Sequence, residues 1–188
     1  ADRAEAAARA WFQTNAIDIV EFREHRLLLA IISRFGKVLS DLPEYPRLVG
    51  LQRMLWTKSR MATREALPLL LKMSEAGLSV MLLKGAARLA LHPEDQKSRV
   101  SHDIDILVRP SEAARALDIL VSGGWTPSSG ESTLCLSARL PGLRSINLFF
   151  GHFGDIDLHQ WGYGPGYASL EARLWDKAQT AKLFDVPV

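Results

Sequence analysis

The chain has 188 residues, of which 47% are hydrophobic and 23% are charged, as is ordinary for a globular protein of one or two domains. This composition excludes intrinsic disorder, a collagen-like repeat and a disulfide scaffold. With 23 Lys and Arg against 21 Asp and Glu, the formal net charge is +2, which argues against a polybasic membrane protein or a strong nucleic-acid signature. The single cysteine, Cys135, predicts a reducing, cytoplasmic compartment. Every apolar run is well short of the roughly 20 residues that a membrane helix needs, so we expect no membrane partner.

The N-terminal part of the chain has the apolar periodicity of helices. We expect helices over residues 1–12, 17–35 and 48–75. Gly36 is a plausible helix stop, the two prolines of "DLPEYP" predict a loop over 41–46, and Pro68 should kink or divide the third helix. Gly77 fits a helix C-cap, and we place the boundary of a helical N-terminal region, residues 1–77, there.

After Gly77 the pattern changes to short apolar runs separated by turn residues. The expected strands cover residues 79–83, 103–108, 133–140, 145–150 and 155–160, and the expected helices cover 86–92, 111–121 and 170–182. Ser111 is a candidate N-cap, and the last three strands have the spacing of antiparallel hairpins. Cys135 should be a small buried residue on one of them. Residues 78–188 therefore form the second region of an α+β protein.

Two of the expected strands carry alternating acidic residues. In "DIDILV", Asp103 and Asp105 point to one face of the strand while the apolar residues between them point into a core. In "DIDLH", Asp155, Asp157 and His159 share one face in the same way. Carboxylates held this close repel one another, and a divalent cation with a preference for hard oxygen ligands removes that repulsion. If the two strands are neighbours, they supply three carboxylates, which suffices for the two metals of phosphoryl or nucleotidyl transfer.

Each Asp-x-Asp segment alone is more often a pair of solvated carboxylates at a sheet edge. The segment "LLKGAA" upstream changes the balance, because it predicts a strand that enters a helix through Gly85. Such a turn lets backbone approach a phosphate and offers free N–H groups at the helix start, beside the charge of Lys84. Arg99 lies between this turn and the Asp pair, where it binds phosphate or pairs with the carboxylates.

The ordered set "LLKGAA", Arg99 with Ser101, "DIDILV" and "DIDLH" resembles the nucleotidyltransferase superfamily that includes DNA polymerase beta. It is most similar to a bacterial family of uncharacterised nucleotidyltransferases, and a comparable Lys-Gly-Gly and Asp-x-Asp pair occurs in abortive-infection toxins. The resemblance implies a minimal polymerase beta-like core, with a mixed sheet flanked by helices, that moves a nucleoside monophosphate from an NTP such as ATP to a hydroxyl. It also implies Mg²⁺ (or Mn²⁺) as the cofactor. Family members continue into further helices, so we expect a chain truncated before them.

The resemblance also implies roles for single residues. Asp103, Asp105 and Asp157 become the catalytic metal ligands, and a second set contacts the nucleotide: Lys84, Gly85, Ala86, Arg99 and Ser101. Ala86 departs from the pattern, because members of the superfamily usually have Gly-Ser at this turn. Asp155 competes with Asp157 as the third carboxylate. His159 either orients the metal site, contacts the acceptor or is a packed strand residue.

Three functions remain open on the sequence. The first is a metal-dependent nucleotidyltransferase, and the second is a degenerate nucleotide-binding regulatory module, which the Gly85-Ala86 departure favours. The third is a toxin that modifies RNA. The acceptor is a sugar, a metabolite, a peptide or protein side chain, or RNA, and nothing in the residues selects among them. Trp161, Tyr163 and Tyr167, which follow the third carboxylate, either stack on a ligand or pack under their loop.

Overall fold

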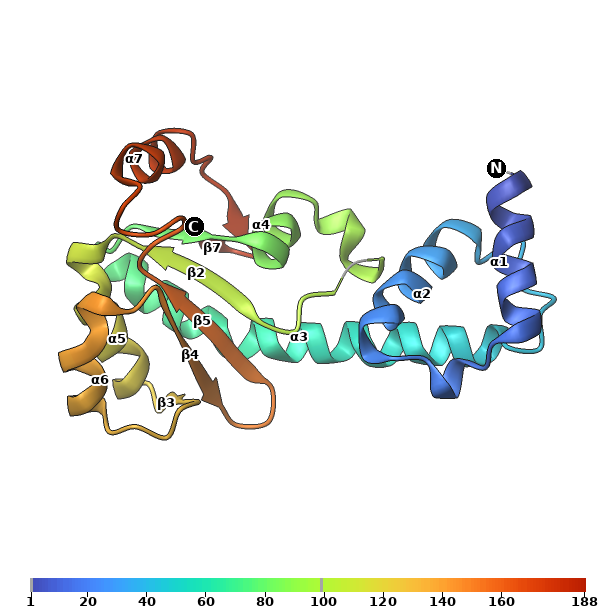
Figure 1. The fold of residues 1–188 in the computed structure, drawn as a ribbon, viewed down its shortest axis with the longest axis horizontal. Coiled ribbons are helices and arrows are strands. Elements are labelled where there is room, and N and C mark those ends of the chain that lie inside the picture. Colours follow the sequence, from blue (N-terminus) through green and yellow to red (C-terminus); the bar gives the residue numbers. More distant parts are fainter. Residues whose placement is uncertain (1, 99) are drawn as a thin grey trace. The chain divides into compact units, whose positions relative to one another are not determined.

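A computed structural model describes residues 2–98 and 100–188 and divides the chain into two compact units (Figure 1). The first unit consists of Ala1–Lys58 with Glu94–Val100, and the second of Ser59–Pro93 with Ser101–Val188. The division falls inside a long helix, whereas the boundary expected at Gly77 follows the change from helical to strand pattern. The first strand does begin just after that glycine, at Val80.

The first unit is helical. It contains α1 (Asp2–Thr14), a 3₁₀ turn (Ile17–Ile19), α2 (Phe22–Phe35), the first part of α3 (Tyr45–Glu75) and, except for its first residue, a second 3₁₀ turn (Pro93–Lys97). The three α-helices, the first 3₁₀ turn and the segment between α2 and α3 all contribute to its core: Ala8, Phe12, Ile17, Leu28, Ile32, Leu39 and Leu48. The expected stop at Gly36 is confirmed, since its N–H caps the carbonyl of Ile32 at the end of α2.

The second unit combines a sheet with helices. After the remainder of α3 it contains β1 (Val80–Leu82), α4 (Lys84–Leu91), β2 (Ile104–Val108), a 3₁₀ turn (Pro110–Glu112), α5 (Ala113–Ser122), β3 (Thr126–Pro127), α6 (Thr133–Arg139), β4 (Ser145–Phe150), β5 (Gly154–His159), α7 (Ala168–Asp176) and the hairpin of β6 (Lys182–Leu183) and β7 (Val186–Pro187). A further 3₁₀ turn, Leu140–Gly142, joins α6 to β4. The expected α+β class, with a helical segment followed by a mixed sheet and helices, is confirmed.

The main sheet has the strand order β1-β2-β5-β4-β3. Strands β2 and β5 run parallel, and the other neighbours are antiparallel. One face is apolar and packs on α3, α5 and α6 through alternate strand residues: Ile104, Ile106 and Val108 of β2, Ile156 and Leu158 of β5, and Ile146 and Leu148 of β4. The period of two therefore leaves the intervening acidic residues on the opposite face.

One predicted strand is wrong. Residues 133–139 form helix α6 instead, and Leu140 begins a 3₁₀ turn, because the hydroxyl of Ser132 accepts the N–H of Cys135 at 3.3 Å and so caps a helix start. Leu136 and Leu140 are buried four residues apart, which is helical spacing. Cys135 is consequently exposed, so its expected burial is also wrong.

Several of the expected helices also differ from the structure, among them the one expected over 17–35, which begins at Phe22 after a separate 3₁₀ turn. Helix α3 continues through Pro68 without a break, with Ala66 and Leu69 on either side buried in the same core. The same helix begins at Tyr45, inside the expected loop, and its Pro46 falls in the first turn, where no N–H is needed. Ser111 lies within a 3₁₀ turn rather than capping α5. Helix α7 ends at Asp176, six residues before the strand β6 begins, so the helix expected over 170–182 is too long.

None of the helices in residues 2–98 and 100–188 combines the length and the apolar character that a bilayer crossing requires.

Candidate metal and nucleotide site

The site begins with the register of two parallel strands. Asp105 of β2 lies directly beside Asp157 of β5, and Leu107 lies beside His159 two positions further on. The neighbours of each aspartate in sequence are buried in the core below the sheet, so both carboxylates project from the other face. Hydrophobic burial on one face thus brings together the two acidic segments that are about 50 residues apart in sequence.

Asp105 is the buried centre of this face, with 1% of its surface exposed. Its Oδ1 lies 2.5 Å from the Lys84 Nζ and 3.0 Å from the His159 Nε2. Carboxylate and imidazole atoms of Asp105, Asp157 and His159 all lie within 4.8 Å of one another. Two carboxylates and one imidazole at this spacing form a donor set that could hold a metal ion.

Asn147 joins the two aspartates of β5. Its side-chain amide donates to the Asp155 Oδ1 at 2.7 Å and to the Asp157 Oδ1 at 2.9 Å. Asn147 sits opposite Asp157 in the antiparallel pairing of β4 with β5. Asn147 is not among the residues predicted from the sequence, although the alternation of the predicted strand 145–150 places it on the polar face. Its two hydrogen bonds fix the orientation of both carboxylates.

Electrostatics bears on which of Asp155 and Asp157 is the third carboxylate of the site. Burial raises the pKa of the Asp155 carboxyl above its ordinary value, and the negative charges of Asp103, Asp157 and Asp105 raise it further, against the opposing hydrogen bond from Asn147. Asp157, not Asp155, belongs to the group of close ligand atoms.

Asp103 immediately precedes β2. It acts at a distance on the electrostatics of Asp155 and Lys84, and it lies outside the group of three close ligands. Its backbone carbonyl accepts the hydroxyl of the buried Ser101 at 2.8 Å, and the Ser101 N–H donates to the Ser59 hydroxyl at 3.2 Å. These two hydrogen bonds of Ser101 fix the segment that leads into β2.

The lysine-glycine turn lies beside this segment. The Leu83 N–H donates to the Asp105 carbonyl at 2.9 Å, and Lys84 has a positive φ of 47° as the chain enters α4. The first backbone bond of α4 runs from the Ala87 N–H to the Leu83 carbonyl, so the amides of Gly85 and Ala86 precede it. A Cβ on Gly85 would lie 2.4 Å from the Ser101 hydroxyl oxygen, which explains why the turn requires glycine.

Lys84 is the cationic partner of the acidic face. Its hydrogen bond to Asp105 raises the pKa of the ammonium group, and the charges of Asp157 and Asp103 raise it further. The side chain is 64% exposed, so it is anchored at one end and open to solvent along its length. Arg99, the other predicted cation, lies outside the described residues.

Glu171 of α7 is a second residue that the sequence analysis missed. Its carboxylate accepts the backbone N–H groups of Gly162 at 3.1 Å, Tyr163 at 2.5 Å and Gly164 at 3.1 Å. This fixes the loop that follows β5 and leaves the rings of Tyr163 and Tyr167 more than half exposed. Burial of the glutamate is a property of the folded chain, so the local sequence holds no signal for this role.

A mixed sheet with facing carboxylates on parallel neighbouring strands, beside a lysine-glycine turn at a helix start, is compatible with the binding of a metal ion and phosphates. The comparison with protein families agrees. The model of the family described as "Uncharacterised nucleotidyltransferase" matches residues 23–187, and the chain belongs to this family. No curated protein and no solved structure matches the chain significantly.

Proposed function

We propose that the protein is a metal-dependent nucleotidyltransferase that moves a nucleoside monophosphate from an NTP to an acceptor hydroxyl. The observation that carries this proposal is the parallel register of Asp105 with Asp157, with the His159 imidazole beside them. Family membership supports the transferase class. The metal, the triphosphate substrate and the roles of single residues belong to this proposal.

Asp105 and Asp157 would hold the cation, with Asp103 as a further carboxylate and His159 as a ligand or as the group that orients Asp105. A divalent cation supplies charge neutralisation at the transferring phosphate. The charges on this face support a bound cation. Four carboxylates lie there with one imidazole, and among the described residues Lys84 is the lysine that balances their negative charge. Asn147 keeps Asp157 in one orientation through its 2.9 Å hydrogen bond.

The phosphates would lie on the turn at Gly85. The amides of Gly85 and Ala86 offer N–H groups, and Lys84 would turn from Asp105 to the phosphate oxygens, for which its exposed stem leaves room. The hydroxyl of Ser101 would take the place of the serine that is missing at position 86. It is close enough to the turn for this role, because its oxygen would lie 2.4 Å from a Cβ placed on Gly85. Arg99 completes the proposed phosphate contacts.

The transfer then requires one new bond and one broken bond. The acceptor oxygen attacks the α-phosphorus, the bond from that phosphorus to the bridging oxygen breaks, and pyrophosphate leaves with its electron pair. Asp157 takes the hydroxyl proton and passes it to solvent. Asp105 is too enclosed for this role, since it is almost fully buried and already contacts Lys84 and His159.

A second candidate is a nucleotide-binding regulatory module without turnover. The Gly85-Ala86 pair favours it, because the hydroxyl of the usual Gly-Ser pair is absent there. The two candidates differ in whether bound triphosphate is split.

The test is pyrophosphate release from each labelled NTP with Mg²⁺ or Mn²⁺, in the presence of a cell extract that supplies acceptors. We expect release by the parent protein and its loss in the Asp105→Asn variant. Asp118→Asn, an exposed aspartate on α5, is the matched control and should retain release. Equal release by the parent and Asp105→Asn proteins contradicts the enzyme, and triphosphate binding without release supports the regulatory module.

A further inference from the structure

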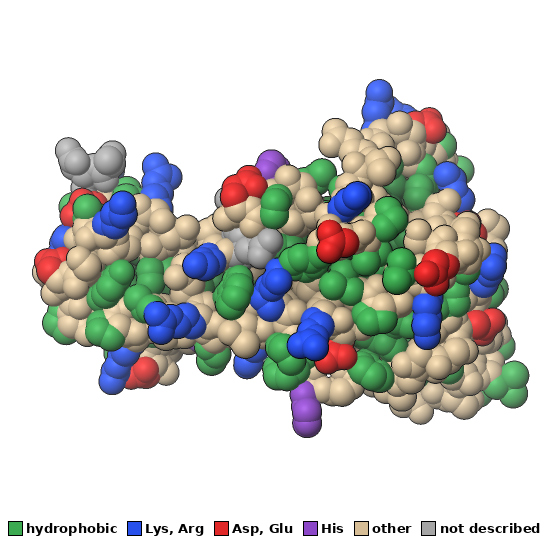
Figure 2. Space-filling view, turned by 180° about the vertical axis from the view of Figure 1, so that it is seen from behind, with side chains coloured by type: hydrophobic (Ala, Val, Ile, Leu, Met, Phe, Trp, Pro, Cys, Tyr) green, Lys and Arg blue, Asp and Glu red, His purple; other side chains and the backbone are tan. Residues whose placement is uncertain are grey.

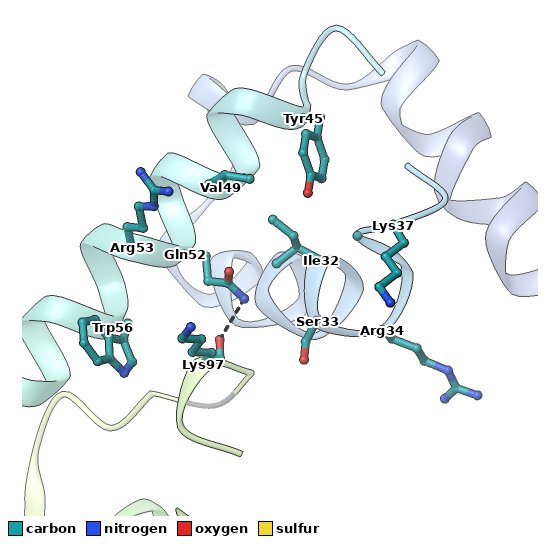
Figure 3. Close-up of a pocket in the computed structure, with 11 residues that line it drawn as sticks. Ile32, Ser33, Arg34, Lys37, Tyr45, Val49, Gln52, Arg53, Trp56 and Lys97 are labelled. Atoms are coloured by element: carbon teal, nitrogen blue, oxygen red, sulfur yellow. Dashed lines mark hydrogen bonds between the residues drawn. The ribbon is translucent and has the colours of Figure 1, made fainter. Parts of the chain in front are cut away.

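A pocket of about 520 Å³ lies within the first unit, between the C-terminal end of α2, the first turns of α3 and the 3₁₀ turn at Pro93–Lys97 (Figure 3). This volume falls within the range of about 300–1,000 Å³ that is usual for small-molecule sites. Every residue that lines it belongs to the first unit. The pocket therefore shares none of its described lining residues with the acidic face of the sheet.

The charged side chains among the described residues that line this pocket are cationic: Arg34, Lys37, Arg53 and Lys97. No Asp or Glu is among those described lining residues. Lys37, Arg53 and Lys97 form no ion pair with a described carboxylate, whereas Arg9 and Arg47 of the same unit pair with nearby aspartates. A pocket whose charged rim is cationic attracts a multiply charged anion.

The uncharged residues that line the pocket offer aromatic and aliphatic surface for an organic group. Tyr45 and Trp56 are half-buried along α3, and the hydroxyl of Tyr45 points toward the buried Ile32 of α2 (Figure 3). The Gln52 side-chain amide donates to the Lys97 carbonyl at 3.2 Å and so ties the 3₁₀ turn to α3. Aromatic and aliphatic surface beside a few charged groups is the usual composition of a ligand pocket.

We propose that this pocket binds a phosphorylated small molecule, with the phosphate on the lysine and arginine side chains and the organic part against Tyr45 and Trp56. A phosphate ester fits better than a carboxylate, because it carries more charge and more acceptor oxygens for several cations. A small molecule fits better than a nucleic acid, because the pocket has the volume of a small-molecule site and the formal net charge of the chain is only +2. On the face shown in Figure 2, basic, acidic and apolar side chains are interspersed. The site does not depend on the proposed nucleotidyl transfer.

The test uses the whole chain in EDTA, so that binding through a divalent cation is excluded. The probes are adenosine 5′-monophosphate, inorganic phosphate and adenosine, and the readouts are calorimetry and the NMR shifts of the Gly36 amide and the Gln52 side chain. The test variant is Lys37→Gln with Arg53→Gln. Its control, Arg3→Gln with Lys58→Gln, removes the same charge from exposed positions outside the pocket.

We expect adenosine monophosphate to bind with shifts at both reporters and adenosine to bind at least about tenfold more weakly, since charge-assisted contacts to phosphate are lost. The test variant should weaken binding by about tenfold or more and the control by less than about twofold. Inorganic phosphate that competes identifies the phosphate group as the recognised part. Absence of binding, equal binding of adenosine, or equal loss in test and control variants overturns the proposal. So does a short RNA that binds far more tightly than the mononucleotide, with a steep salt dependence.

Discussion

The close approach of Gly85 to Ser101 makes Gly85→Ala the sharpest single test of how the lysine-glycine turn is built. A Cβ at this position would lie 2.4 Å from the Ser101 hydroxyl oxygen and 3.1 Å from the Ser101 Cβ. The hydroxyl can rotate away only by giving up its 2.8 Å hydrogen bond to the Asp103 carbonyl. The contact with the Ser101 Cβ remains after that rotation, and Ser101 cannot retreat easily because it is 7% exposed.

The lost hydrogen bond and the remaining overlap together predict a destabilisation of about 1–3 kcal/mol for Gly85→Ala. For a chain of this size, that lowers the melting temperature by roughly 2–12 °C. Thermal and urea unfolding, followed by circular dichroism, measure the change. Ser101→Gly removes both clashing atoms, so the double variant Gly85→Ala/Ser101→Gly should be less destabilised than the sum of the two single variants. Gly85→Ala with parental stability, or strictly additive effects in the double variant, would refute the proposed close contact.

Three further changes test the acidic face and the loop beside it. The raised pKa of Asp155 means that its ionised form destabilises the folded protein above the ordinary value of 3.8 and not below it. Asp155→Asn should therefore raise the urea midpoint at pH 7 and leave it unchanged near pH 3, and a gain at both pH values argues against an electrostatic cause. Glu171→Ala should cost about 2 kcal/mol and speed hydrogen exchange at the Gly164 amide, which loses its acceptor; unchanged exchange there contradicts the anchoring role. Lys84→Met should cost about 1–3 kcal/mol in chemical denaturation at pH 7, because the buried carboxylate of Asp105 loses its cationic partner, and an unchanged urea midpoint contradicts this ion pair.

The sheet could be predicted from the sequence because its strands alternate apolar and acidic residues. Period two fixes which residues of β2 and β5 share a face, and that pattern alone placed Asp105, Asp157 and His159 on one side. The alternation does not show that the two strands are neighbours, whereas the structure does. Asn147 was within reach of the same reasoning, since it lies on the polar face of β4 opposite Asp157.

Other parts of the fold depend on contacts that the local pattern does not contain. The segment at residues 133–139 has alternating residues that suit a strand, but the Ser132 cap and the burial of Leu136 decide for a helix. Pro68 breaks the local rule for helices, and the core contacts of its neighbours hold α3 together through it. Glu171 binds a loop seven to nine residues away in sequence, so only the folded chain reveals its role.

The central claim is that Asp105 and Asp157 together bind a divalent cation, and titration with Mn²⁺ followed by electron paramagnetic resonance tests it most directly. Mn²⁺ takes the same oxygen and imidazole donors as the proposed metal, and its free and bound forms can be counted separately. We predict that the parent protein and the Asp118→Asn control bind Mn²⁺, that Asp105→Asn and Asp157→Asn each lose at least tenfold in affinity, and that NTP strengthens binding in the parent. Equal Mn²⁺ binding by the parent and the Asp157→Asn protein, with both folded, would contradict the account.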